Sequence, residues 1–238
     1  MAFCIIETMR IHNGIISEML HINEETCLIL KGHPGLEGKA GQFLQAFGED
    51  PEELLPTLLY PCGMDSQGPL WCGAIPKSWQ PGDTIRYRGP RGNGFHLPPL
   101  ARRVVLTCLD EISINRLLPL ADLALQNGAE VTILSDRQMT ALHPAIELLG
   151  LVDMAAAFGW ADYAGLVLQP RKLTDFGRNL KSEPPAACEV MLDTPMVCDE
   201  SSACGVCSVL TSKGSKLICK DGPVFNLADL LNLEAGYG

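Results

Sequence analysis

The sequence lacks any apolar run long enough to cross a membrane, and it is poor in basic residues. No segment supplies the roughly 18 consecutive apolar residues that a membrane-spanning helix needs. Its 18 lysines and arginines are outnumbered by 28 aspartates and glutamates, which gives a formal net charge of −10. An acidic surface does not attract nucleic acid or anionic lipid. The sequence therefore predicts no membrane insertion and no nucleic-acid partner.

Several patterns of catalytic and secreted proteins are also missing. The five histidines show no HxxxH or HExxH spacing, and no G-x-S-x-G elbow is present, so neither a histidine metal site nor a hydrolase of that type is expected. The start, MAFCIIETMR, has no basic stretch before its short apolar run, unlike a signal peptide. It reads as a first strand. A cytoplasmic protein is expected.

Ten cysteines in 238 residues are too few for a small disulfide scaffold. Six of them are scattered, mostly within apolar stretches, and are expected to be buried and reduced. These six are Cys4, Cys27, Cys62, Cys72, Cys108 and Cys188.

The first 99 residues have the texture of a small antiparallel barrel. Apolar or alternating runs such as GIISEMLHI, TCLILKG, GQFLQAF and GDTIRYRGP are separated by turn residues. Runs of this length and spacing are typical of short strands. An antiparallel β-barrel is therefore predicted over residues 1–99.

From Ala101 onward the pattern changes to alternating strands and helices. RRVVLTCL, AEVTILSD and YAGLVLQP are continuous apolar runs, as in parallel strands buried on both faces. Between them, SINRLLPLADLALQNG and PAIELLGLVDMAAAFG (144–159) have helical spacing, and Gly128 is the expected C-cap of the first. Residues 100–185 are thus predicted to form an α/β domain with a parallel sheet. CEVMLD is one more expected strand, and residues 186–238 form a third, small domain. The expected fold class is multidomain α+β.

Four cysteines in the third domain form a distinct pattern. Cys198, Cys204, Cys207 and Cys219 have the spacing C-x5-C-x2-C-x11-C. Zinc sites usually present two close pairs, whereas three cysteines in one loop and a distant fourth are typical of [2Fe–2S] sites. The spacing favours a [2Fe–2S] cluster, with zinc, disulfides and inert thiols as the alternatives.

The stretch PMVC…ACGVCSV…CKDGPVF resembles the cluster domain of the electron-transfer subunit family of dihydroorotate dehydrogenase. GQFLQAF (41–47) is similar to that family's Pro-Gly-Gln-Phe strand, with Ala40 in place of proline. QPGDTIRYRGPRGNGFHLP (80–98) is similar to its Pro-Gly-Asp strand and the glycine-rich turn after it. The resemblance implies a member of the ferredoxin-reductase superfamily, which has a flavin-binding barrel, a nucleotide-binding α/β domain and a [2Fe–2S] domain.

This sequence departs from the family at the positions that hold the nucleotides. The family's flavin strand carries arginine and serine where LLPTLL has Leu55 and Leu58, which cannot bind a pyrophosphate. After the first parallel strand the family has glycines, whereas LDEIS places Asp110 and Glu111 there. Negative side chains are unfavourable for phosphate binding at a helix N-terminus, and Asp110 is expected to be an ordinary N-cap. These residues argue against FAD and against NAD(P).

The turn Gly92, Asn93 and Gly94 would belong to a cofactor site only if FAD is retained. Otherwise it is part of the barrel architecture or a partner contact.

The function expected from these features is single-electron transfer. The chain would be a non-catalytic iron–sulfur subunit, with no acid, base or nucleophile of its own. It would exchange electrons with a redox cofactor, expected to be a flavin, in a partner dehydrogenase subunit. One alternative is a scaffold or assembly subunit with a structural cluster or zinc. The other is a flavin reductase with a rebuilt FAD site.

Overall fold

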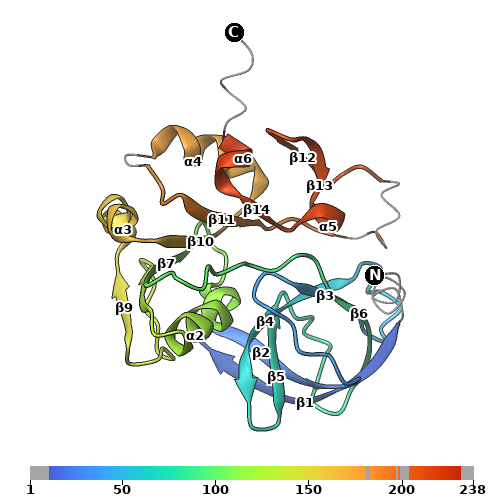
Figure 1. Ribbon diagram of the computed structural model, residues 1–238. Coiled ribbons are helices and arrows are strands. Elements are labelled where there is room, and N and C mark those ends of the chain that lie inside the picture. The colour runs from blue at the N-terminus through green and yellow to red at the C-terminus, as the bar shows by residue number, and fades with distance from the viewer. Residues whose placement is uncertain (1–10, 181–182, 197, 199–203, 232–238) are drawn as a thin grey trace.

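A six-stranded sheet lies across the middle of the molecule, between a β-barrel and a smaller cysteine-bearing layer (Figure 1). The computed structural model describes residues 11–180, 183–196, 198 and 204–231. The expected first strand at the N-terminus lies almost wholly outside the described residues.

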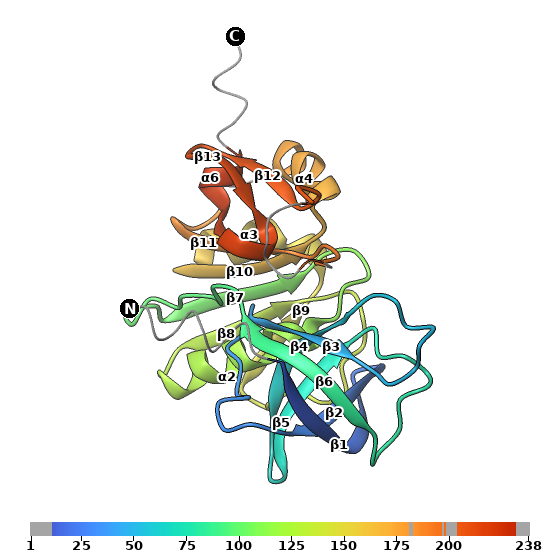
Figure 2. The same cartoon turned by 90° about the vertical axis from the view of Figure 1, so that its right-hand side faces the viewer.

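The barrel is closed and antiparallel, as the sequence predicts, with the strand order β1-β2-β5-β4-β3-β6 (Figure 2). Alternation along the strands points Leu28, Leu30 and Trp71 into one buried core. Its six strands are β1 (His12–Ile22), β2 (Glu25–Lys31), β3 (Phe43–Phe47), β4 (Thr57–Asp65), β5 (Gly68–Gly73) and β6 (Thr84–Arg91).

The central sheet has the order β14-β11-β10-β7-β8-β9. Five of these strands are parallel, and β14 is antiparallel to β11 at one edge. Every residue of β10 is buried, as expected for a strand covered on both faces. The strands are β7 (Arg103–Cys108), β8 (Glu130–Leu134), β9 (Ile146–Leu149), β10 (Tyr163–Leu168), β11 (Ala187–Leu192) and β14 (Val224–Asn226).

Helix α2 (Leu118–Gln126) packs between the sheet and barrel strand β4. The expected C-cap is confirmed: Gly128 adopts a left-handed conformation with φ of 75°, donates to Leu125 O, and is followed by a bond from Ala129 N to Ala124 O. This pair of bonds is a Schellman motif, which ends the helix and starts the next buried strand.

The N-terminal side of that helix differs from the expectation. Asp110 is not an N-cap; it lies in a turn with φ of 63°. The cap of the 3₁₀ helix Ile114–Leu117, which leads into α2, is Ser113, whose hydroxyl accepts from Asn115 N at 3.2 Å. The turn after β7 extends through Ile112, so the cap lies three residues later than expected, at the serine instead of the aspartate.

The single helix expected over 144–159 is also wrong in its first half. Residues Ile146–Leu149 form β9, which pairs with Val131–Leu134 of β8, and only then do a 3₁₀ turn (Leu151–Asp153) and α3 (Met154–Trp160) follow. The short apolar run IELL fits both the helical and the strand periodicity. The free edge of β8 decides in favour of the strand.

Beyond the sheet lies a layer that contains the cysteines, shown above the sheet in Figure 1. It consists of α4 (Leu173–Asn179), α5 (Ile218–Asp221), α6 (Leu227–Leu231) and the hairpin of β12 (Ser208–Thr211) and β13 (Gly214–Leu217). Two strands from the segment expected as a third domain, β11 and β14, are part of the central sheet. The division into three domains therefore stays a prediction.

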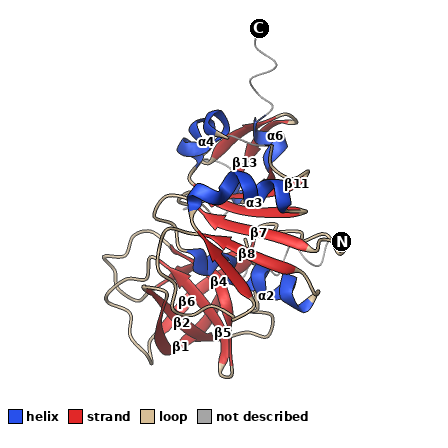
Figure 3. Cartoon of the chain, turned by 90° about the vertical axis from the view of Figure 1, so that its left-hand side faces the viewer, coloured by secondary structure: helices blue, strands red, loops and turns tan. Residues whose placement is uncertain are grey.

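Figure 3 shows that the helices gather around the sheet, whereas the barrel consists of strands and loops. Within the described part of the chain, none of the helices has the length and apolar character needed to cross a membrane.

Candidate functional site

Two of the four predicted ligands are brought together by the β12–β13 hairpin. Cys207 directly precedes β12. Helix α5 directly follows β13, and Cys219 is its second residue. Since Ser208 pairs with Leu217 in this hairpin, the residues just outside its open end must be neighbours. Ile218 N donates to Cys207 O at 2.9 Å, and Cys219 N donates to Cys207 Sγ at 3.4 Å. The 11-residue spacing is thus the length of one tight hairpin.

Cys198 approaches the same point from the segment after β11. Its Sγ atom lies 3.7 Å from Cys219 Sγ. Cys207 and Cys219 are only 5% and 2% exposed, whereas Cys198 is half-buried. Burial, together with contacts to the thiols of Cys207 and Cys198, raises the pKa of Cys219. The structure therefore brings two of the other predicted ligands, Cys198 and Cys207, to Cys219.

Cys204 is exposed, and residues 199–203, which lead into it, lie outside the described residues. Gly205 turns the chain between Cys204 and Cys207 with φ of 61°, a left-handed conformation that glycine adopts without strain. Over the described ranges, no three His, Cys, Asp or Glu side chains are arranged to hold a metal ion. Ligation by the four cysteines stays a prediction.

The chemistry of the gathered thiols fits an iron–sulfur cluster. Thiolates are the ligands that such clusters use, and three adjacent thiolates repel one another unless a cationic centre balances them. The bond from Cys219 N to Cys207 Sγ is of the N–H···S kind that tunes these centres. Cys198, Cys207 and Cys219 therefore have the chemistry of ligands for the group that the sequence predicts, whereas Cys204 is exposed.

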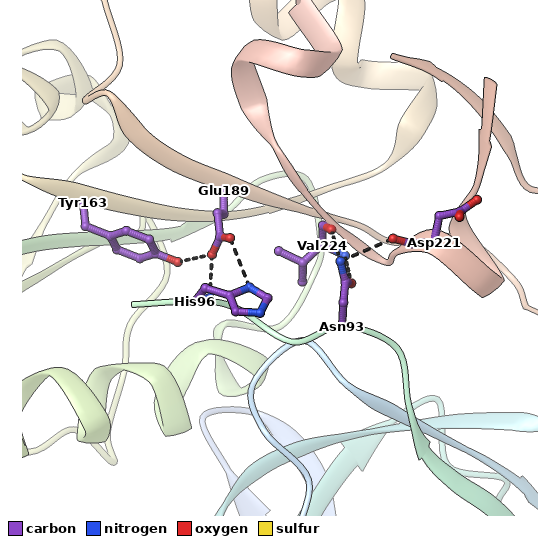
Figure 4. A network of polar contacts seen from close by, with 6 residues as sticks. All are labelled: Asn93, His96, Tyr163, Glu189, Asp221 and Val224. Atoms are coloured by element: carbon purple, nitrogen blue, oxygen red, sulfur yellow. Dashed lines mark hydrogen bonds and ion pairs between the residues drawn. The ribbon is translucent and has the colours of Figure 1, made fainter. Parts of the chain in front are cut away.

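The turn Gly92-Asn93-Gly94 touches this layer. Asn93 Nδ2 donates to Val224 O at 2.8 Å and to Asp221 O at 3.3 Å, while Val224 N donates back to Asn93 Oδ1 at 3.1 Å (Figure 4). Asn93 N also donates to Gly222 O at 3.0 Å. The turn thus binds the segment that directly follows Cys219. A role of this turn in flavin binding stays a prediction.

A second polar contact ties the linker after the barrel to the sheet (Figure 4). The Glu189 carboxylate on β11 accepts from His96 N at 2.7 Å and from Tyr163 Oη at 2.8 Å, and its other oxygen lies 3.4 Å from His96 Nδ1. Burial and the charge of Glu189 raise the pKa of Tyr163 well above its usual value. The bonds of Asn93 and of His96 therefore hold the segment after β6 against the central sheet.

A cavity of about 700 Å³ lies where the barrel meets the sheet. Leu55 and Leu58 both line it, together with Tyr60, Arg116 and Asp193. The Arg116 guanidinium stacks on the Tyr60 ring at 3.9 Å from its centroid, and its Nη1 lies 2.6 Å from Asp193 Oδ1. The two leucines that replace the family's polar residues are therefore at the cavity wall, where they supply no hydrogen-bond donor.

A second cavity of about 560 Å³ opens at the carboxyl ends of β7 and β8. This edge of a parallel sheet is where α/β proteins bind nucleotides. Carboxylates prevail over the two arginines, Arg116 and Arg137, in its lining. The six acidic residues are Glu24, Glu25, Asp110, Glu111, Asp136 and Asp193. Such a lining disfavours a pyrophosphate.

The sequence did not reveal that three of the scattered cysteines meet. Cys27 and Cys72 are direct partners across β2 and β5, and the Cys62 thiol on β4 contacts both. All three are at most 4% exposed, so their expected burial is confirmed. Only the strand order, which no local pattern encodes, places them together.

The C-terminal layer has a known relative. Residues 202–231 match the family model of the iron–sulfur cluster binding domain of dihydroorotate dehydrogenase B. This match contains Cys204, Cys207 and Cys219, and it confirms the resemblance to that family over these residues.

Solved structures share the fold over three quarters or more of this chain. The structure of an NADH-dependent reduced ferredoxin-NADP oxidoreductase is similar with a TM-score of 0.71 and 20% identity, over 94% of this chain and 93% of that one. Phthalate dioxygenase reductase has a TM-score of 0.53 and 15% identity over 76% of this chain and 69% of its own. The ferredoxin reductase of carbazole 1,9a-dioxygenase has a TM-score of 0.52 and 10% identity over 75% and 67%. These similarities confirm the predicted ferredoxin-reductase fold.

Proposed function

We propose that this chain, whose residues 202–231 match the iron–sulfur cluster binding domain of dihydroorotate dehydrogenase B, is the electron-transfer subunit of an oxidoreductase complex. The observation that carries the proposal is the convergence of Cys198, Cys207 and Cys219 at the mouth of the β12–β13 hairpin. A bound [2Fe–2S] cluster supplies one-electron chemistry. Cys198, Cys204, Cys207 and Cys219 would hold it.

The protein's own residues act by placement and by charge. The hairpin fixes Cys207 against Cys219, and Asn93 anchors the chain just beyond Cys219. The exposure of Cys204 leaves one side of the site open to a partner. The partner is a protein subunit whose own cofactor, a flavin in this proposal, exchanges single electrons with this site. A cytoplasmic location is part of the same proposal.

A second candidate function is that of a flavin reductase with a rebuilt FAD site. The 700 Å³ cavity favours it, because the stacked pair of Tyr60 and Arg116 offers one planar wall and one cation. Leu55 and Leu58 weigh against it, since they remove the expected donors to the flavin phosphates.

One preparation separates these functions from a structural zinc site. The chain would be purified anaerobically, alone and with co-expressed neighbouring subunits, and iron, sulfide, zinc and flavin would be measured per chain. We expect iron and sulfide in equal amounts, little zinc, and flavin only in the partner. Zinc without sulfide would refute the electron-transfer function. Stoichiometric FAD in the isolated chain, with rapid bleaching by NADH, would establish the reductase instead.

A further inference from the structure

Gln45 and Arg91 form a buried polar pair on neighbouring barrel strands, β3 and β6. Gln45 is 2% exposed and Arg91 is 3% exposed. Arg91 Nη1 donates to Gln45 Oε1 at 2.6 Å. A buried amide and a buried guanidinium are costly unless their hydrogen bonds are made, so the partners of this pair indicate what it is for.

The amide of Gln45 faces the segment that bears the first predicted ligand. Its Nε2 donates to Met196 O at 2.7 Å and to Cys198 O at 2.8 Å. These two bonds use both hydrogens of the amide nitrogen. The amide cannot be flipped, because its nitrogen would then meet the guanidinium of Arg91 and its oxygen would meet two carbonyl oxygens. Arg91 therefore fixes the orientation in which Gln45 holds Cys198.

The position of Cys198 matters for the whole site, since its Sγ lies 3.7 Å from Cys219 Sγ. With its carbonyl oxygen bound to Gln45, the negative end of that peptide dipole is turned toward the barrel. The positive charge of Arg91 is connected to the backbone of Cys198 through two successive hydrogen bonds, from Arg91 to Gln45 and from Gln45 to Cys198 O. Reduction adds one negative charge to a cluster, and a nearby buried cation stabilises that charge.

We propose that Gln45 and Arg91 are positioning residues that fix Cys198 and raise the reduction potential of the cluster held beside it. This inference rests on the proposed function, because it assigns a role toward the same cluster. The barrel thereby takes part in electron transfer through this pair, whether or not it binds a flavin.

The test is a redox titration of the loaded, full-length chain, with iron and sulfide measured in the same samples. Arg91→Gln should lower the equilibrium constant for one-electron reduction about tenfold, which corresponds to about 59 mV. Arg91→Lys, which keeps the charge, should restore most of the loss. Arg86→Gln is the matched control: it removes the same charge from an exposed position on the same strand, and it should leave the potential unchanged.

Gln45→Glu keeps the volume and the bond to Arg91, so it remains informative if Arg91→Gln fails to fold. It loses both donors to the carbonyls and adds a negative charge, and its potential should fall. A loaded wild type with unchanged potentials in Gln45→Glu and Arg91→Gln would overturn this inference alone. An equal shift in Arg86→Gln would overturn it too. A wild type without iron and sulfide would overturn both the inference and the proposed function.

Discussion

Asn93 and Val224 exchange two hydrogen bonds across 131 positions of the sequence: Asn93 Nδ2 donates to Val224 O at 2.8 Å, and Val224 N donates to Asn93 Oδ1 at 3.1 Å. The first residue belongs to the turn after barrel strand β6, and the second begins β14, just beyond Cys219. Val224 lies within the residues that match the cluster-domain family model, and Asn93 lies in the glycine-containing turn outside them. These two stretches are therefore one interface, which joins the barrel to the cysteine layer.

Asn93→Ala should weaken this interface without disturbing the barrel interior. It leaves the buried N–H and C=O of Val224, a residue that is 2% exposed, without their partner, at a cost of about 1–3 kcal/mol. The free energy of unfolding should fall by that amount, and iron should be lost faster to a chelator. Asn179→Ala, which removes an exposed amide bonded to Asp175 O, should change neither. Equal chelation rates in both variants would contradict this role of Asn93.

Gly92→Ala should destabilise the contact between the turn after β6 and the segment that follows Cys219, and more strongly than Gly82→Ala destabilises the barrel. Gly92 has φ of 84°, and an added Cβ would lie 2.6 Å from Pro223 Cδ and 3.0 Å from Gly222 O. Neither the proline ring nor the backbone can yield cheaply, so the two layers must separate. We expect the free energy of unfolding to fall by about 1–3 kcal/mol more than backbone strain alone would cause.

Gly82→Ala is the control for that strain. Gly82 has φ of 99° but no atom within 4 Å of an added Cβ. Chemical denaturation of both variants should show the larger loss for Gly92→Ala. Equal losses would mean that the contact with Pro223 has no energetic importance.

The patterns that were predicted correctly are those written in local sequence. Continuous apolar runs gave the buried parallel strands, and the glycine at position 128 gave the end of α2. The β9 strand was missed because IELL fits both a helix and a strand, and only its pairing with β8 distinguishes them. The cap was misplaced for a similar reason, since Asp110 and Ser113 are both good N-caps and the length of the turn decides between them.

The sequence predicted the candidate ligands but not the residues that hold those ligands in position. The spacing of the cysteines predicted four ligands; Cys198, Cys207 and Cys219 lie together in the structure, and ligation by all four stays a prediction. The partner of Cys198 O is Gln45, 153 positions away, and nothing in the sequence around either residue specifies that contact. It results from the packing of the closed barrel against the segment after β11.

Tyr163 should make stability depend on pH in the alkaline range. Its folded-state pKa is raised by burial and by Glu189, whereas in the unfolded chain a phenol loses its proton near pH 10. The stabilising contribution is therefore complete below about pH 10 and is lost as the pH rises above that value. Tyr163→Phe should be less stable by about 1 kcal/mol near neutral pH.

The difference between Tyr163→Phe and the wild type should shrink above about pH 10. Urea unfolding at a series of pH values measures it, and phenolate absorbance of the folded protein gives an independent reading. A difference that stays constant over this range, or titration of Tyr163 at its usual pKa in the folded state, would contradict the assignment.

NADH should not reduce the isolated chain. The cavity at the ends of β7 and β8 is lined by six carboxylates and two arginines, and Asp110 occupies the turn where a glycine would let phosphate approach. Anaerobic addition of NADH should leave the visible spectrum of the loaded protein unchanged, whereas dithionite should bleach it. Bleaching by NADH at a comparable rate would show that the pyridine nucleotide site is functional.

The central claim, a single-electron site made by the four cysteines, is tested most directly by electron paramagnetic resonance of the reduced protein. The account predicts a signal of a reduced [2Fe–2S] cluster in the wild type, its loss in Cys207→Ser, and its retention in Cys108→Ser. Cys108 is the matched control because its thiol lies outside the site and donates to Ser113 O at 3.3 Å, a bond that serine can keep. A wild type that contains zinc and gives no signal, or an unchanged signal in Cys207→Ser, would contradict the account.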